Sequence, residues 1–171
     1  LPKVLQNDWP SDPIDFFVLS KMETQKLTPS PMAKGGTLVR RLYYDLTGLP
    51  PTEIQLTNFL KAFSENPAKA KLDLIDSLLS SHHFGEKWGR LWLDVARYAD
   101  SNGKDRNIYN FHAWRYRDYV IDSFNRDIPF DRFVKEQIAG DLLPAHSREE
   151  RDRNLIATGF LSLGSKSFEE L

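Results

Sequence analysis

The sequence of 171 residues contains no cysteine. This absence excludes disulfides, thiolate zinc sites, a cysteine nucleophile and covalent attachment of a c-type haem within these residues. No apolar run approaches the roughly 20 residues needed to span a bilayer, so we expect no membrane-spanning helix. The N-terminal residues LPKVLQNDWP also lack the basic segment followed by an apolar one that marks a secretory signal. If the parent protein is exported, its signal has been removed or lies upstream.

An excess of charge of either sign is also missing. The 23 lysine and arginine residues balance 24 aspartate and glutamate residues, which gives a formal net charge of −1. Because the total charge does not attract polyanions, nucleic acid is not an expected partner. Hydrophobic residues make up 40% of the chain, so we expect a folded domain with a real core rather than disorder.

Signatures of catalysis and of metal binding are absent as well. The sequence has no nucleophile elbow, phosphate-binding loop, dinucleotide fingerprint or HExxH pair. Its four histidines include the adjacent His82 and His83, and neighbouring side chains on a helix point about 100° apart and rarely chelate one ion. We therefore expect no metal and no cofactor in this chain, and whether it belongs to an enzyme stays open.

The sequence is rich in apolar residues at helical spacing. Cap signals support this period, with Ser11, Thr52 and Ser147 as predicted N-caps and Gly48 as a predicted C-cap. The helices are predicted near residues 12–26, 38–49, 52–63, 67–79, 88–98, 114–124, 130–140 and 147–164. We expect an all-α fold, a compact bundle-like array of about eight helices without significant sheet, in a single domain over residues 1–171.

Aromatic residues concentrate in the middle of the chain, where ten of the 21 lie between Phe84 and Phe124. Large rings bury more area than other side chains, so the simplest interpretation of this concentration is a hydrophobic core. The alternative is a platform on which a carbohydrate or another planar ligand stacks.

Charged side chains are interleaved with these rings. Arg90, Asp94 and Arg97 are spaced so that a helix places all three on one face, where they can form ion pairs. Because Asp94 lies between Leu93 and Val95, we expect it to be largely buried and bonded to an arginine or a backbone donor. The cluster is either a structural ion-pair network or the site of a binding or catalytic carboxylate.

The stretch from Asp100 to Ala113 lacks a helical period and exceeds the usual length of a connection. We predict an ordered loop packed beside the 88–98 helix, with Ile108, Tyr109 and Phe111 docked because apolar side chains are costly to leave in water. Turn chemistry is supplied by Asn102, Gly103, Asp105 and Asn107. Such a loop either contacts a glycan or a partner domain, or merely connects two helices.

The candidate binding residues come from this helix, this loop and the start of the next helix. They share charged, imidazole or aromatic side chains that suit a ligand or a partner, and none is assigned a catalytic role. The set is Asp94, Arg97, Tyr98, Asp100, Tyr109, His112, Trp114, Arg115, Arg117 and Asp118.

Several stretches together resemble a known family: LTGLPPT at 46–52, WLDVARYADS at 92–101 and WRYRDYVI at 114–121. They are similar to the planctomycete cytochrome-associated domain of unknown function, and the resemblance extends from Asp12 to Gly164. It implies a large exported bacterial protein, periplasmic or at the cell surface, in which this domain often follows a c-type cytochrome domain and precedes a second uncharacterised one. The sequence departs from its relatives at Lys34-Gly35-Gly36 and at Leu91, where a histidine is often found.

The resemblance also bears on cofactor and partners. Relatives commonly continue past the equivalent of Leu171 into a CxxCH haem-attachment segment. The chain is therefore expected to be a fragment of a larger multidomain protein, with c-type haem in neighbouring parts. We favour a helical module that scaffolds or docks neighbouring domains of the same protein. The alternative is part of an enzyme that acts on polysaccharide or a similar extracellular substrate and passes electrons to a c-type cytochrome.

Overall fold

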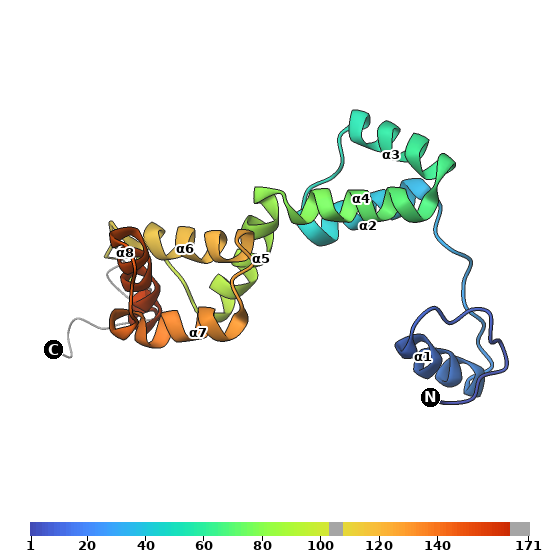
Figure 1. Cartoon of the computed structure of the whole chain (residues 1–171), viewed down its shortest axis with the longest axis horizontal. Helices are drawn as coiled ribbons and strands as arrows, with labels where there is room; N and C mark the ends of the chain where they lie inside the picture. The colour runs from blue at the N-terminus through green and yellow to red at the C-terminus, as the bar shows by residue number, and fades with distance from the viewer. Residues whose placement is uncertain (103–107, 165–171) are drawn as a thin grey trace. The chain divides into compact units, whose positions relative to one another are not determined.

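The computed structural model describes residues 1–102 and 108–164. The chain divides into two units, Leu1–Lys34 and Gly35–Leu171. The described residues form eight α-helices and no β-strand, and none of these helices has the length and apolar character needed to cross a membrane. The helices (Figure 1) are α1 Pro13–Thr24, α2 Gly35–Thr47, α3 Glu53–Glu65, α4 Pro67–Leu79, α5 His82–Val95, α6 Ala113–Asn125, α7 Phe130–Ala139 and α8 Arg148–Ala157. The predicted all-α fold is confirmed, while the single-domain organisation stays a prediction.

A reciprocal capping box begins α1 in the first unit. The Asp12 carboxylate accepts the N–H of Ile14 at 2.8 Å, and the Asp15 carboxylate accepts the N–H of Asp12 at 3.3 Å. The predicted N-cap, Ser11, is therefore wrong by one residue. Asp12 takes the position because it directly precedes Pro13, whose missing N–H suits the first residue of a helix.

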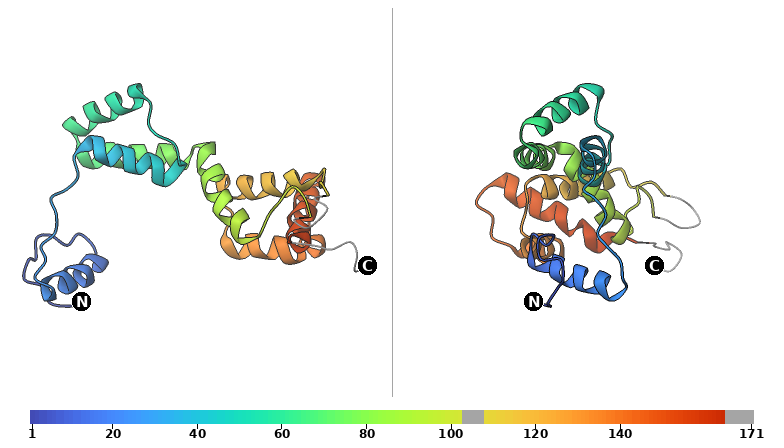
Figure 2. Two further views of the ribbon diagram at one scale, coloured as in Figure 1. Left: turned by 180° about the vertical axis from the view of Figure 1, so that it is seen from behind. Right: turned by 90° about the vertical axis from the view of Figure 1, so that its right-hand side faces the viewer.

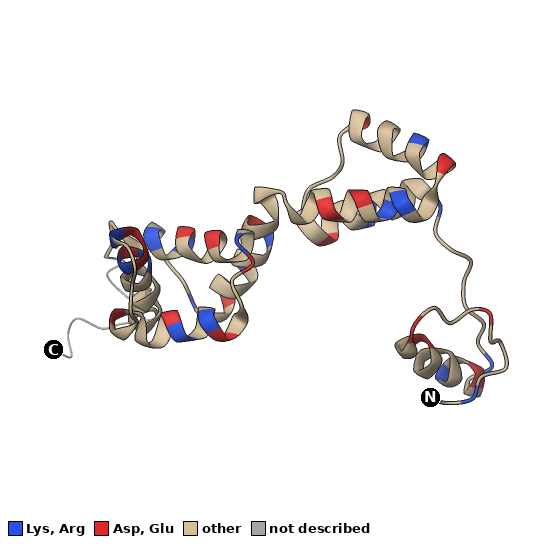
Figure 3. Ribbon diagram, viewed as in Figure 1, with Lys and Arg blue, Asp and Glu red and all other residues tan. Residues whose placement is uncertain are grey.

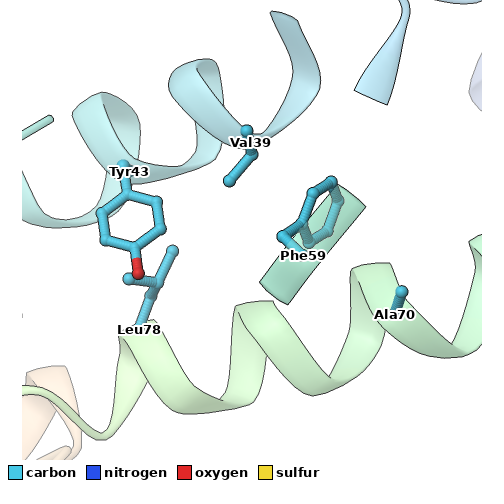
Figure 4. Close-up of a cluster of buried hydrophobic side chains, with 5 residues drawn as sticks. All are labelled: Val39, Tyr43, Phe59, Ala70 and Leu78. Atoms are coloured by element: carbon cyan, nitrogen blue, oxygen red, sulfur yellow. The ribbon is translucent and has the colours of Figure 1, made fainter. Parts of the chain in front are cut away.

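Helices α2, α3 and α4 surround an apolar core. The capping box of Thr52 and Gln55 begins α3 as predicted, and Gly48 follows α2 with a φ of +72°. Glycine tolerates that left-handed conformation because it has no Cβ. Five buried side chains from the three helices form the core (Figure 4): Val39, Tyr43, Phe59, Ala70 and Leu78.

Helices α5 and α6 approach each other closely over two glycines of α5. A Cβ at Gly85 would lie 2.5 Å from the carbonyl oxygen of Ile121, and one at Gly89 would lie 3.2 Å from the Ile121 side chain. The Asn125 amide fastens this contact, because its Oδ1 accepts the N–H of Gly85 at 2.8 Å and its Nδ2 donates to the carbonyl of His82 at 3.2 Å. The two helices that flank the candidate site are therefore held at a fixed separation.

Helix α8 lies beside α6 and α7 (Figure 2), and the three share a second buried cluster. The rings of Tyr119 and Phe133 stack with centroids 5.9 Å apart, and Trp92 of α5 meets Phe133 edge-on at 4.9 Å. The buried members are Tyr116, Tyr119, Val120, Phe133 and Ala157. Some of the aromatic residues between Phe84 and Phe124 therefore belong to the hydrophobic core, as the simplest interpretation predicts.

Helix α5 ends earlier than predicted. The N–H of Tyr98 donates to the Leu93 carbonyl at 2.9 Å and the N–H of Arg97 to the Asp94 carbonyl at 3.2 Å, which are the two bonds of a Schellman motif. Arg97 adopts a φ of +57°, in the position that glycine most often occupies. The chain from Arg97 onward therefore leaves the helix, although Val95 and Tyr98 continue the apolar spacing.

Candidate functional site

A groove of about 950 Å³ lies in the second unit. Its walls come from the residues that follow α5, from the first turn of α6 and from the end of α8 with the 3-10 helix η2 (Thr158–Ser162). Four of the ten predicted site residues line it: Arg97, Tyr109, His112 and Arg115. The groove therefore joins segments that are far apart in the sequence.

Two short stretches after α5 pair with each other and carry Tyr109 to the groove. The N–H of Asn102 donates to the Ile108 carbonyl at 3.0 Å, and the N–H of Asn110 donates to the Asp100 carbonyl at 2.7 Å. The Asn102 Oδ1 also accepts the N–H of Ile108 at 3.0 Å. Backbone pairing thus orders both described ends of the predicted loop. Three predicted turn residues lie outside the described part of the chain: Gly103, Asp105 and Asn107.

The apolar side chains of this segment do not dock as predicted. Ile108, Tyr109 and Phe111 expose 43%, 55% and 77% of their surface. Tyr109 and Phe111 contact each other edge to face, with ring centroids 5.3 Å apart. Because the two stretches satisfy backbone groups on each other, the segment is ordered without burying these side chains.

The first turn of α6 carries Trp114 and Arg115. The Arg115 guanidinium carbon lies 5.7 Å from the centroid of the Trp114 ring, a cation–π arrangement. Arg115 lines the groove, whereas the exposed Trp114 does not. His112 is the N-cap residue of α6, and its side chain makes no capping hydrogen bond.

Tyr98, Asp100, Arg117 and Asp118 form a cluster that does not line the groove. The Tyr98 hydroxyl donates to Asp100 Oδ1 at 2.6 Å, and Arg117 Nε donates to Asp118 Oδ1 at 3.0 Å. Burial and the bond to Asp100 raise the pKa of Tyr98 above its usual value, and the nearby Arg117 opposes the rise. The Tyr98 ring stacks on Tyr116, which does line the groove, with centroids 6.3 Å apart. The cluster therefore contacts the groove wall through the stacking of Tyr98 on Tyr116.

Asp94 is exposed, so the prediction that it is buried and bonded to a donor is wrong. Its carboxylate has no ion pair or hydrogen bond within residues 1–102 and 108–164. The helical period puts Asp94 on the side of α5 opposite the buried Gly85. Arg97 lies beyond the end of α5, so the helix does not place its side chain on the same face as that of Asp94.

Sequence reasoning missed a buried carboxylate on α7, that of Glu136. Its Oε1 accepts Arg132 Nε at 2.7 Å, and its Oε2 accepts Arg153 Nη1 at 2.7 Å and the Tyr119 hydroxyl at 2.9 Å. Burial and this carboxylate raise the pKa of Tyr119. The network ties α6, α7 and α8 together, and the pairing of both carboxylate oxygens offsets the cost of burying the charge.

A second buried polar group, Gln137, connects this core to the groove wall. Its Oε1 accepts Trp92 Nε1 at 3.1 Å and also accepts the hydroxyl of Tyr116. Trp92 Nε1 donates to the Tyr116 oxygen as well, at 3.0 Å. Burial raises the pKa of Tyr116 to about 12, although the bond from Trp92 acts in the opposite direction. The Tyr116 side chain therefore faces the groove from a fixed position.

Apolar spacing assigned the wrong buried face to α7. The apolar residues at helical spacing that predict this helix are Phe130, Phe133, Val134 and Ile138, yet Phe130 and Ile138 are exposed. The buried residues are Phe133, Glu136, Gln137 and Gly140, which follow the helical period with polar side chains in two of its positions. The sequence offered one signal, the position of Glu136 three residues after Phe133. The three groups that donate to Glu136 lie on another turn of α7, on α6 and on α8.

His82 and His83 do not point apart as the sequence suggested. Their ring centroids are 3.9 Å apart, and His83 Nδ1 lies 2.8 Å from a carboxylate oxygen of Glu86. Potential ligand atoms of the three residues lie within 4.8 Å of one another. They occupy the first turns of α5, however, and the positive end of a helix disfavours a cation.

Comparison with known families gives one result. The family model of PSCyt2, described as a protein of unknown function (DUF1549), matches residues 13–170. This chain belongs to the PSCyt2 family. A search of curated proteins and a search of solved structures found no match. The description of PSCyt2 assigns no reaction to the family.

Proposed function

We propose that this chain is a non-catalytic binding module of a larger exported, cytochrome-associated protein, and that its groove holds a saccharide chain. One observation carries the proposal: a groove of about 950 Å³ combines the exposed rings of Tyr109 and Phe111 with the guanidinium groups of Arg97 and Arg115. Ligand pockets of about 300–1,000 Å³ pair aromatic side chains with a few polar groups in this way. A sugar ring offers an apolar face to an aromatic ring and hydroxyls to polar groups.

The composition of the groove supports a holding role rather than catalysis. Among the lining residues that the structure describes, no carboxylate accompanies His112, so an acid–base pair is lacking there. The absence of cysteine supports the proposal that any c-type haem of the parent protein is attached in its neighbouring parts. The module would hold a polymer while those parts act on it.

Alanine substitution of the groove rings tests this function. We expect Tyr109→Ala and Phe111→Ala each to weaken polysaccharide binding by the full-length parent protein about three- to tenfold, because each removes an aromatic contact. Affinity electrophoresis in gels that contain a neutral or an acidic polysaccharide measures the effect. Phe130→Ala is the matched control, since Phe130 is an exposed ring that does not line the groove. Unchanged retardation of both groove variants would contradict the proposal.

A second candidate function is docking of a neighbouring domain through α7. A different surface of this unit supports it. Phe130, Ile138 and Leu142 are all exposed, and an apolar pocket of about 370 Å³ lies beside Phe130. Phe130 and Ile138 lie on α7 and Leu142 on the 3-10 helix η1 (Gly140–Leu142) that follows it, and exposed apolar residues on consecutive elements are typical of contact sites.

The double variant Ile138→Ser with Leu142→Ser tests the docking function. If α7 docks a neighbouring domain, the variant should enlarge the radius of gyration of the parent protein in small-angle scattering. The same radius in variant and parent would exclude docking by this face.

A further inference from the structure

We infer that the saccharide bound in the groove carries a carboxylate, and that Arg97 and Arg115 bind this group. The inference rests on the proposed saccharide-binding function and adds the chemical class of the ligand.

The groove is electrostatically one-sided. Arg97, His112 and Arg115 line it, and none of its described lining residues is acidic. Elsewhere in this unit, lysine and arginine are mixed with aspartate and glutamate along α6, α7 and α8 (Figure 3). The formal net charge of the chain is −1, so the positive character of the groove is local. A ligand with negative charge fits this distribution.

The two groove arginines, Arg97 and Arg115, differ from most arginines of the following helices because they form no ion pair with the described residues. Neither Arg97 nor Arg115 forms an ion pair with any residue that the structure describes. From the start of α6 to the end of α8, five arginines have a carboxylate partner, and Arg151 is the other one without a partner among the described residues: the five are Arg117, Arg126, Arg132, Arg148 and Arg153. Two guanidinium groups thus remain available in the groove, and guanidinium binds carboxylate through two parallel N–H···O bonds.

Backbone geometry fixes both arginines in the groove wall. Arg97 occupies the left-handed position of the Schellman motif that ends α5. Lys26 after α1 and Asp127 after α6 adopt the same left-handed conformation, so a positive φ is not special to Arg97. What sets Arg97 apart is its position in the groove wall and its lack of an ion-pair partner among the described residues. Arg115 lies in the first turn of α6, where the partial positive charge of the helix acts in the same direction as its own.

The neighbouring rings indicate what carries the carboxylate. Tyr109 and Phe111 lie edge to face in the same groove, and Asn110 between them adds an amide. A free carboxylate or phosphate would leave the rings without a contact. A sugar acid supplies a carboxylate for the guanidinium groups and an apolar ring face for Tyr109 or Phe111, so it uses both features of the groove.

Calorimetric titration of the full chain with two tetrasaccharides tests the inference. We expect tetragalacturonate to bind at least about tenfold more tightly than neutral maltotetraose, and this advantage should shrink as salt is added. Arg97→Asn, which keeps a residue that tolerates the left-handed conformation, and Arg115→Gln should each weaken tetragalacturonate binding about tenfold. Both variants should weaken maltotetraose binding far less, so the difference in affinity between the two tetrasaccharides should shrink. Arg90→Gln is the matched control, because Arg90 is also exposed and unpaired within the described residues but does not line the groove.

Three other binding results would overturn the carboxylate inference, the saccharide function or both. Equal affinity for the two tetrasaccharides would overturn the carboxylate inference and leave saccharide binding intact. Binding of neither would overturn the saccharide function as well. Tetraglutamate bound as tightly as tetragalacturonate would assign the groove to an acidic peptide and overturn the saccharide class. If circular dichroism shows that Arg97→Asn does not fold, Arg115→Gln decides, and unchanged affinity in that variant overturns the inference.

Discussion

The two buried clusters of the second unit are built on different principles. Around Val39 and Phe59, apolar side chains of α2, α3 and α4 fill the core. Around Tyr119, the core also holds the carboxylate of Glu136 and the amide of Gln137, both bonded. The groove lies beside the second cluster, which contributes Tyr116 to its wall. We interpret the polar core as the device that fixes this wall, because directional bonds permit fewer arrangements than apolar contacts.

Removal of the buried carboxylate is expected to have the largest effect. Glu136→Ala leaves Arg153 without its buried partner and should lower the free energy of unfolding by about 4 kcal/mol, near the cost of breaking a buried ion pair. Urea unfolding followed by circular dichroism measures this loss. Asp131→Ala removes the exposed carboxylate that pairs with Lys135 on the same helix and should change stability little. Equal effects of the two substitutions would show that burial does not matter here.

Truncation in the apolar cluster gives the contrasting case. Leu78→Ala should lower the free energy of unfolding by about 3 kcal/mol through lost burial and a cavity. Because Leu78 belongs to the cluster that does not contribute to the groove, saccharide affinity should stay unchanged where the variant is folded. A weakened affinity would remove the functional distinction between the two clusters.

A pair of glycine substitutions tests the close approach of α5 and α6. A Cβ at Gly85 meets the carbonyl of Ile121 and the amide of Asn125, so Gly85→Ala should destabilise the chain by about 2 to 3 kcal/mol. A Cβ at Gly36 of α2 meets nothing within 4 Å, so Gly36→Ala should stabilise by up to about 1 kcal/mol. Thermal unfolding of both variants measures the difference. Stabilisation by Gly85→Ala as well would mean that the contact of α5 with α6 does not need a small residue at this position.

Alkaline pH tests the polar core at the groove wall. Burial raises the pKa of Tyr116 to about 12 from an ordinary value of 10.0, so the protonated phenol favours the folded state. Its contribution is complete below pH 10 and is lost as the pH rises from 10 through 12. The loss is on the order of 2 kcal/mol, since one pKa unit corresponds to about 1.4 kcal/mol. Unfolding of the wild-type chain and of Tyr116→Phe across this window should show a shallower decline in the variant; parallel declines would remove the role of this phenol.

Local signals in the sequence predicted most of the fold. The capping box at Thr52 and the glycine at position 48 were identified because each acts within one turn of the chain. The buried face of α7 was misassigned because Glu136 is tolerated only through donors on other turns and helices. Apolar spacing has no access to such long-range pairing.

The candidate site was predicted in part for the same reason. Arg97, Tyr109, His112 and Arg115 share the groove because they lie close together in the chain. Another part of the wall, which includes Leu155 and Gly159, comes from a distant segment, and no local signal in the sequence places that segment beside the residues that follow α5. The predicted pairing of Asp94 with Arg97 failed because the end of α5 is set by backbone hydrogen bonds rather than by side-chain type.

The most direct test of the groove as the binding site is hydroxyl-radical footprinting of the full chain with and without tetragalacturonate. We expect oxidation of Tyr109 and Phe111 to fall severalfold when the saccharide is present, while oxidation of Phe130 and Leu142 stays the same. Unchanged oxidation of Tyr109 and Phe111 at a saturating concentration of the saccharide would contradict it.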